Sequence, residues 1–198
     1  MPITFQRLKE LLIAPHELLP RIARERNINE AMVMLALNWI LFSVAFSLLS
    51  GNYSLIPVTI VFGILGTLVF TFFFYLALTV ISGKRDFAGV LVALTYPFFG
   101  IASSSLVVSL FFLWSEVFAT VLAIVLFMLY FTVALTGVYR VIRETHKLDV
   151  VTVWVVSSLL LLAAFGSIYL VTGMYTLKTG TLLSSLQQLF STPLSSLS

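Results

Sequence analysis

Five long stretches of the sequence contain no Asp, Glu, Lys, Arg or His, and they constrain the fold more than any other feature. They cover residues 31–50, 57–81, 88–113, 117–139 and 150–172. Each is 20 to 26 residues long, and at about 1.5 Å per residue a helix of that length crosses a hydrocarbon core of roughly 30 Å. The stretches lack the alternation of barrel strands, and a bilayer otherwise accepts only helices. The sequence therefore predicts five membrane-spanning helices.

The predicted fold class is all-α: a polytopic integral membrane protein with a five-helix transmembrane bundle and short amphipathic helices at both ends. We expect residues 1–30 to form a cytoplasmic amphipathic segment, 31–172 the membrane domain and 173–198 an amphipathic segment on the outer face. Only 10% of the residues are charged and 60% are hydrophobic, whereas roughly a quarter are charged in a soluble domain. This composition excludes a soluble enzyme and a disordered tail.

The distribution of basic residues predicts the orientation. Lys178 lies beyond the last predicted span, and the other ten Lys and Arg residues lie in connections that share the opposite side. By the positive-inside rule the N-terminus is cytoplasmic and the C-terminus lies outside. About 30 polar and amphipathic residues precede the first span, which predicts an uncleaved anchor rather than a signal peptide. The expected location is a prokaryotic cell membrane, or the ER or Golgi membrane in a eukaryote.

The N-terminal segment has the spacing of an amphipathic helix. Leu8 and Leu11 fall on one face of residues 3–13, Pro15 interrupts the helix, and a second piece follows that includes Leu18. Two interpretations remain open: this segment lies on the lipid headgroups, or it docks onto a protein partner. Asn27 and Glu30 form a candidate capping pair before the first span.

A break is predicted in the third span. Proline removes a backbone hydrogen bond, so Pro97 after Tyr96 predicts a kink between residues 93 and 100. Small residues that favour close helix packing occur in spans two, three and five; they are Gly63, Gly66, Gly100, Ser104, Ala163 and Ser167. One interpretation is an ordinary kinked, tightly packed helix with spans two and three crossing at Gly66 and Gly100. The other is a broken helix that forms a transport site.

Residues that perform chemistry are scarce. The chain has no cysteine and two histidines, His16 and His146, and a metal site needs three or four convergent ligands. No charged residue lies within a predicted span, which weighs against proton or ion coupling. We therefore expect no enzymatic activity, no catalytic or metal-binding residues, no cofactor and no nucleic-acid partner.

A basic surface is predicted on the cytoplasmic side. Arg140, Arg143 and Lys147 follow the fourth span at helical spacings of three and four, and Lys84 and Arg85 lie between spans two and three. This surface either meets anionic lipid or binds an acidic partner.

The order of these features resembles the Yip domain family, the Ypt/Rab-interacting five-span membrane proteins. The resemblance covers nearly the whole chain. The resemblance rests on these short segments of the sequence: Phe5-Gln6-Arg7-Leu8-Lys9-Glu10-Leu11-Leu12-Ile13-Ala14-Pro15, Asn29-Glu30-Ala31, Gly83-Lys84-Arg85-Asp86-Phe87, Tyr96-Pro97 and the basic turn at Arg140. Eukaryotic members are trafficking adaptors that contact one another and prenylated small GTPases. Their Asp-Leu-Tyr-Gly-Pro-type motif is absent here, so the chain is more similar to the minimal prokaryotic branch.

Two functions follow as hypotheses. The first is a non-enzymatic membrane organiser or adaptor whose partners are the lipid bilayer, further copies of itself or other membrane proteins, with a small GTPase implied only by family analogy. The second is a permease or channel for a neutral or lipid-like substrate, built around the kinked third span.

Overall fold

The computed structural model describes residues 5–13, 15–159 and 162 of the 198-residue chain. Within them the regular elements are helices, and four of these are long and apolar enough to cross a membrane. The four are α3 (Ile28–Ser50), α4 (Leu55–Ser82), the third helix (Phe87–Phe112) and α7 (Glu116–His146). The name "third helix" is used below for Phe87–Phe112, which is the third of the long helices and is distinct from α3. It comprises α5 (Phe87–Thr95), a 3₁₀ turn η1 (Tyr96–Phe98) and α6 (Phe99–Phe112). Two short helices, α1 (Phe5–Ile13) and α2 (Pro15–Glu25), precede them.

Local chemistry explains where the long helices begin and end. The predicted cap of α3 is confirmed, because the Asn27 side chain accepts a hydrogen bond of 3.2 Å from the backbone amide of Glu30. Gly51 ends α3 with a φ of 67°, a left-handed conformation that costs a glycine little. Ser115 caps α7 by accepting from the amide of Phe118. The tight turns after Ser50 and Leu113 hold each pair of flanking helices antiparallel.

Part of the predicted architecture lies outside the described residues. A helix over Val150–Leu159 begins where the fifth span is predicted. Most of residues 160–172, including Ala163 and Ser167, and the C-terminal segment 173–198 are not among the residues described. The structure therefore describes four of the five predicted spans over their full length.

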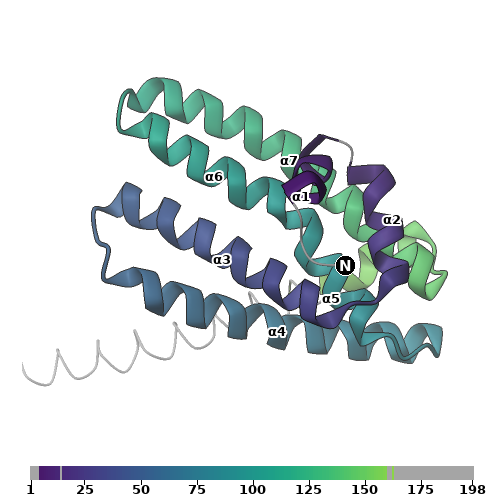
Figure 1. Ribbon diagram of the computed structural model, residues 1–198. Coiled ribbons are helices and arrows are strands. Elements are labelled where there is room, and N and C mark those ends of the chain that lie inside the picture. Colours follow the sequence, from purple (N-terminus) through teal and green to yellow (C-terminus); the bar gives the residue numbers. More distant parts are fainter. Residues whose placement is uncertain (1–4, 14, 160–161, 163–198) are drawn as a thin grey trace, which may run out of the picture. The chain divides into compact units, whose positions relative to one another are not determined.

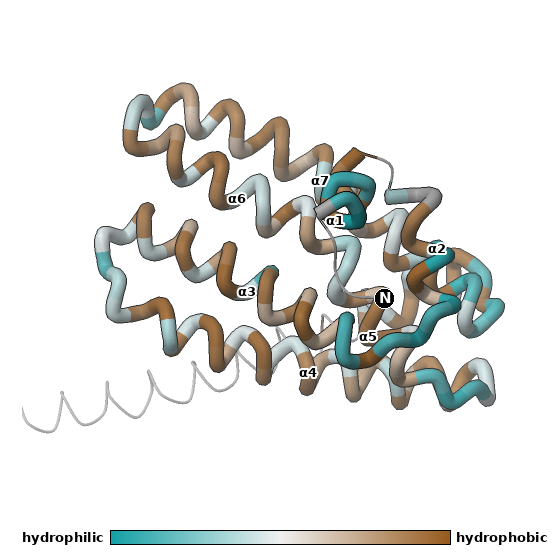
Figure 2. Tube along the Cα trace, viewed as in Figure 1, coloured by the Kyte–Doolittle hydropathy of each residue, from teal (hydrophilic) through white to brown (hydrophobic). Residues whose placement is uncertain are grey.

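The four long helices form two hairpins. In Figure 1, α6 lies between α3 and α7, and α4 lies on the far side of α3. The third helix is the most enclosed: 67% of its most apolar stretch is buried, against 17% for α4 and 11% for α7. Figure 2 shows hydrophobic residues along the long helices, with hydrophilic residues gathered at the turns and at the end where α2 lies. The third helix is thus the core of the bundle.

The apolar face of α2 is covered by protein. Leu18, Leu19, Ile22 and Ala23 are buried, and α2 packs on α7 and α5. This placement differs from the interpretation that the segment lies on lipid headgroups. Close approach to α7 is possible because Gly137 has no side chain: a Cβ there would lie 2.7 Å from Cδ1 of Leu19.

Candidate functional site

The break in the third helix coincides with Pro97. Within η1 the amide of Phe99 donates to the carbonyl of Tyr96, one residue nearer than the α-helical partner, Thr95. The Thr95 carbonyl accepts a hydrogen bond of 2.8 Å from Nδ2 of Asn38 on α3. Thr95, Tyr96 and Asn38 are all buried. A neighbouring helix therefore satisfies the polar group that the turn releases, and the interruption falls inside the predicted interval of residues 93–100.

The small residues singled out in the sequence have different surroundings. A Cβ on Gly100 would overlap the ring of Tyr130 on α7, and a Cβ on Gly63 would overlap the indole of Trp39 on α3. A Cβ on Gly66 would have no neighbour within 4 Å. Spans two and three therefore do not cross at Gly66 and Gly100 as expected, because Gly100 faces α7 and Gly66 faces open space. The Ser104 hydroxyl is buried and donates to its own helix at the Ile101 carbonyl, 2.9 Å away.

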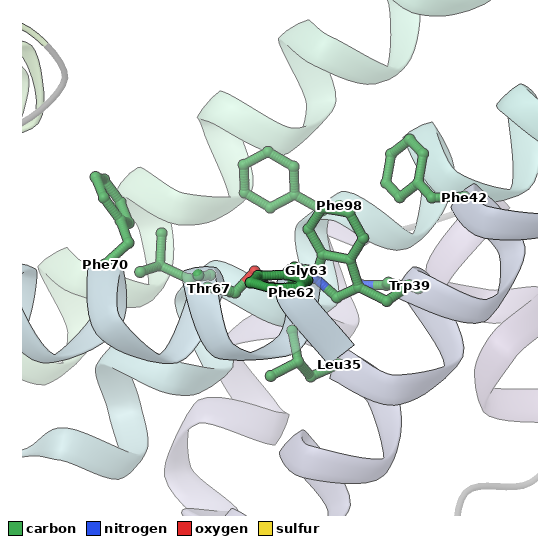
Figure 3. Close-up of a pocket in the computed structure, with 11 residues that line it drawn as sticks. Leu35, Trp39, Phe42, Phe62, Gly63, Thr67, Phe70 and Phe98 are labelled. Carbon is green, nitrogen blue, oxygen red and sulfur yellow. The ribbon is translucent and has the colours of Figure 1, made fainter. Parts of the chain in front are cut away.

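A pocket of about 380 Å³ lies between α3 and α4 beside η1. Its walls are apolar and largely aromatic, as Figure 3 shows for Trp39, Phe62, Phe70 and Phe98. Nε1 of Trp39 donates to Oγ1 of Thr67 on α4 over 2.9 Å, which links the two helices across the pocket. Asn38, whose Nδ2 binds Thr95, also lines it. The pocket fits an apolar or weakly polar molecule far better than an ion.

Charged residues from two connections meet the end of α7 at one end of the bundle, here called the charged end. Arg26 and Asp86 form an ion pair with 3.2 Å between Nη2 and Oδ2, and Oδ1 of Asp86 caps α5 by accepting from the Gly89 amide. Nζ of Lys84 donates to the Thr145 carbonyl near the end of α7. Lys84 from the predicted basic surface therefore lies beside α7.

The remaining members of the predicted basic surface differ in position. Arg140 and Arg143 are exposed on α7, and Lys147 is exposed at the C-cap position that follows it. Arg85 is exposed on the connection before α5. The imidazole of His146 is buried, and its Nδ1 lies 2.8 Å from Oγ1 of Thr145. The side chain of His16 is outside the described part of the chain. Among the side chains that are described, no group of three His, Cys, Asp or Glu residues could hold a metal ion.

An ion-pair cluster fastens α1 to the bundle. Nη1 of Arg7 lies 2.8 Å from Glu30 at the start of α3, and Nη2 lies 2.9 Å from Glu25 at the end of α2. Burial lowers the pKa of the Arg7 guanidinium, but the hydrogen bonds and charges of the two glutamates outweigh it and raise this pKa above its ordinary value. A buried carboxylate needs such a partner, so Glu30 depends on Arg7.

Sequence reasoning missed the two interactions that organise these sites. Asn38 is the single amide residue in the stretch 31–50, and a lone amide at membrane depth is a signal for an interhelical hydrogen bond. The pairing of Arg7 with Glu30 spans 23 residues, and no sequence spacing rule indicates it.

No protein-family model matches the sequence, and neither the curated proteins nor the solved structures contain a match to it.

Proposed function

We propose that the chain is a non-enzymatic integral membrane protein of Yip-domain type, which organises membranes through contacts with other membrane proteins or further copies of itself. Its N-terminus lies in the cytoplasm and its charged end faces the same side. Ten of its eleven Lys and Arg residues precede the first predicted span or lie in the second and fourth connections, and this asymmetry supports the orientation.

The observation that carries the proposal is the contrast between a closed core and open flanks. The broken third helix has its released carbonyl satisfied by Asn38, so the break needs no ligand to be stable. On the flanks, large apolar side chains of α4 and α7, such as Phe73 and Met128, are exposed. Apolar side chains on a membrane helix can contact lipid or another helix, and close packing between helices decides which.

Photocrosslinking in native membranes tests this function. A photoreactive amino acid is placed singly at Phe73 on α4 or Met128 on α7, with the fully buried Leu78 as control. We expect discrete adducts with other protein chains from position 73, position 128 or both. From position 78 we expect crosslinks within one chain only. Adducts with lipid alone from both flanks would contradict an organising role.

A second candidate is a permease for a neutral or lipid-like substrate. The pocket between α3 and α4 supports it, because the pocket adjoins η1 through Phe98 and is lined mainly by apolar side chains. Purified protein in liposomes should then move a fluorescent neutral lipid between leaflets, and Pro97→Leu should abolish the movement. Phe73→Leu, which changes an exposed ring on α4, is the matched control. Liposomes in which the unaltered protein moves nothing would eliminate this candidate.

A further inference from the structure

Two adjoining cavities follow α7, which packs against α2, and the first of them also reaches the end of α1. The first, of about 370 Å³, is lined mainly by apolar side chains, among them Ile13, Leu129 and Val133. The second, of about 660 Å³, is lined by polar and charged side chains that include Arg143 and Lys147. Thr136 and Arg140 line both cavities, which makes them one continuous groove, here called the α2–α7 groove.

Among the described residues that line the groove, three are basic and one is acidic. Arg140 and Arg143 are three residues apart and share one face of α7. Lys147, the residue that ends α7 in a left-handed conformation, lines the same polar cavity. The acidic side chain beside them, Glu144, accepts from Arg24 of α2 at 2.9 Å and 2.7 Å, so its charge is already matched. Cations at a helix C-terminus are favourable by themselves, but that preference does not account for an apolar cavity that opens beside them.

The dimensions of the groove suit an amphiphile. From Leu129 to His146, the last residue of α7, the helix rises by about 26 Å at 1.5 Å per residue. One bilayer leaflet with its headgroup region measures roughly 20–22 Å, so the groove is long enough for a lipid molecule. The apolar part lies nearer the middle of α7 and the basic part at its end. A ligand that fills both needs an anionic group at one end and a hydrocarbon chain at the other.

We infer that the α2–α7 groove binds one anionic glycerophospholipid from the leaflet on the side of the charged end. Its phosphate lies against Arg143 and Lys147, Arg140 stands at the junction of headgroup and chain, and an acyl chain lies along Ile13, Leu129 and Val133. A soluble phosphate would leave the apolar cavity exposed, and an acidic peptide would bring polar backbone into it. The inference rests on the membrane location in the proposed function but not on the organising role.

Lipid binding to the purified full chain in detergent tests the inference. Phosphatidylglycerol and phosphatidylcholine are titrated separately, and bound lipid is counted by native mass spectrometry. We expect one tight phosphatidylglycerol and weaker phosphatidylcholine. The double variant Arg143→Gln/Lys147→Gln should bind phosphatidylglycerol about thirtyfold more weakly, or roughly 2 kcal/mol, since each basic residue near anionic lipid contributes about half of that.

Matched variants separate the groove from general effects. Arg85→Gln removes an exposed cation outside the groove and should leave binding unchanged. Thr132→Trp fills the apolar cavity, which Thr132 lines from an exposed position, and should weaken binding, whereas Val125→Trp on the same helix outside the groove should not. Thermal unfolding of each variant shows that it is folded.

Three results would overturn the inference: full phosphatidylglycerol binding by the double variant, equal binding of the two lipids, or displacement of the lipid by glycerol 3-phosphate. The last would indicate a site for a soluble phosphate compound. Because binding is measured on isolated protein, its failure leaves the crosslinking result for the organising role unaffected.

Discussion

The side chain of Asn38 donates the hydrogen bond to the third helix that a backbone amide would donate in an unbroken helix. Pro97 cannot donate, the following turn tightens, and the Thr95 carbonyl takes its hydrogen bond from α3. A polar group without a partner is costly in a water-free interior. The break and the amide are therefore complementary, although they lie 57 residues apart in the sequence.

Replacing Asn38 with Leu should destabilise the protein by about 1–2 kcal/mol, because it leaves the buried Thr95 carbonyl without a donor. Thr71→Val is the matched control: the Thr71 hydroxyl is also buried, but it donates to a carbonyl of its own helix at Thr67. Thermal unfolding in detergent measures both. Equal losses for the two variants would show that the hydrogen bond across the helices has no special weight.

Two glycines of α4 should respond oppositely to substitution by alanine. Gly63→Ala should cost on the order of 1–3 kcal/mol, since its Cβ would overlap the Trp39 indole. Gly66→Ala meets nothing within 4 Å and should stabilise the protein by up to ~1 kcal/mol through helix propensity. Thermal unfolding of the two variants side by side checks this, and a larger loss for Gly66→Ala would contradict the packing described.

The contrast between these glycines shows the limit of sequence reasoning. Charge-free length predicts where a membrane helix runs, since burying a charge in lipid is costly, and four predicted spans coincide with described helices. It does not predict how each helix is rotated about its axis. Gly63 and Gly66 are three residues apart and both line the pocket between α3 and α4. A Cβ on Gly63 would nevertheless overlap Trp39 of α3, whereas a Cβ on Gly66 would meet nothing within 4 Å. Side-chain shapes on the neighbouring helix, above all Trp39, decide between them.

At the scale of elements, α1 is held by charge and α2 by apolar contact. Arg7 and Glu30 are both largely enclosed, with side chains 16% and 4% exposed, whereas the pair Arg24 and Glu144 is 72% and 40% exposed. Removing one partner of an enclosed pair leaves the other charge buried without a counter-ion, which destabilises the protein strongly. An exposed pair contributes only about 0–1 kcal/mol to the free energy of unfolding.

Arg7→Met should therefore release α1 from the bundle, and Arg24→Gln should not. Hydrogen–deuterium exchange over residues 5–13 measures the docking directly: we expect fast exchange in Arg7→Met and unchanged protection in Arg24→Gln. A combined Arg7→Met/Glu30→Gln variant should recover part of the stability lost by Arg7→Met, because no carboxylate then remains unpaired. Protection of α1 that survives Arg7→Met would show that Leu11 and its apolar neighbours suffice.

At the scale of the whole molecule, the absence of cysteine makes topology directly measurable. Single cysteines at Tyr53 and Trp114, in the turns on one side, and at Arg85 and Lys147 on the other, are treated with a membrane-impermeant thiol reagent in intact cells. We expect labelling at 53 and 114 only, because the basic residues favour the cytoplasm. Labelling at 85 and 147 in place of 53 and 114 would reverse the orientation and, with it, the leaflet from which the α2–α7 groove takes its lipid.

The docking of α2 on α7 has a consequence for biosynthesis. Almost 120 residues separate Leu19 from Gly137, and a ribosome adds about 5–20 residues per second. For about ten seconds, therefore, α2 has been synthesised but α7, which covers its apolar side, has not. During that interval an amphipathic helix without a protein partner can bury its apolar side in the bilayer surface. We therefore expect the α2 segment to lie on the membrane surface until α7 has been synthesised and then to pack against α7. The amphipathic pattern of its sequence would serve both stages.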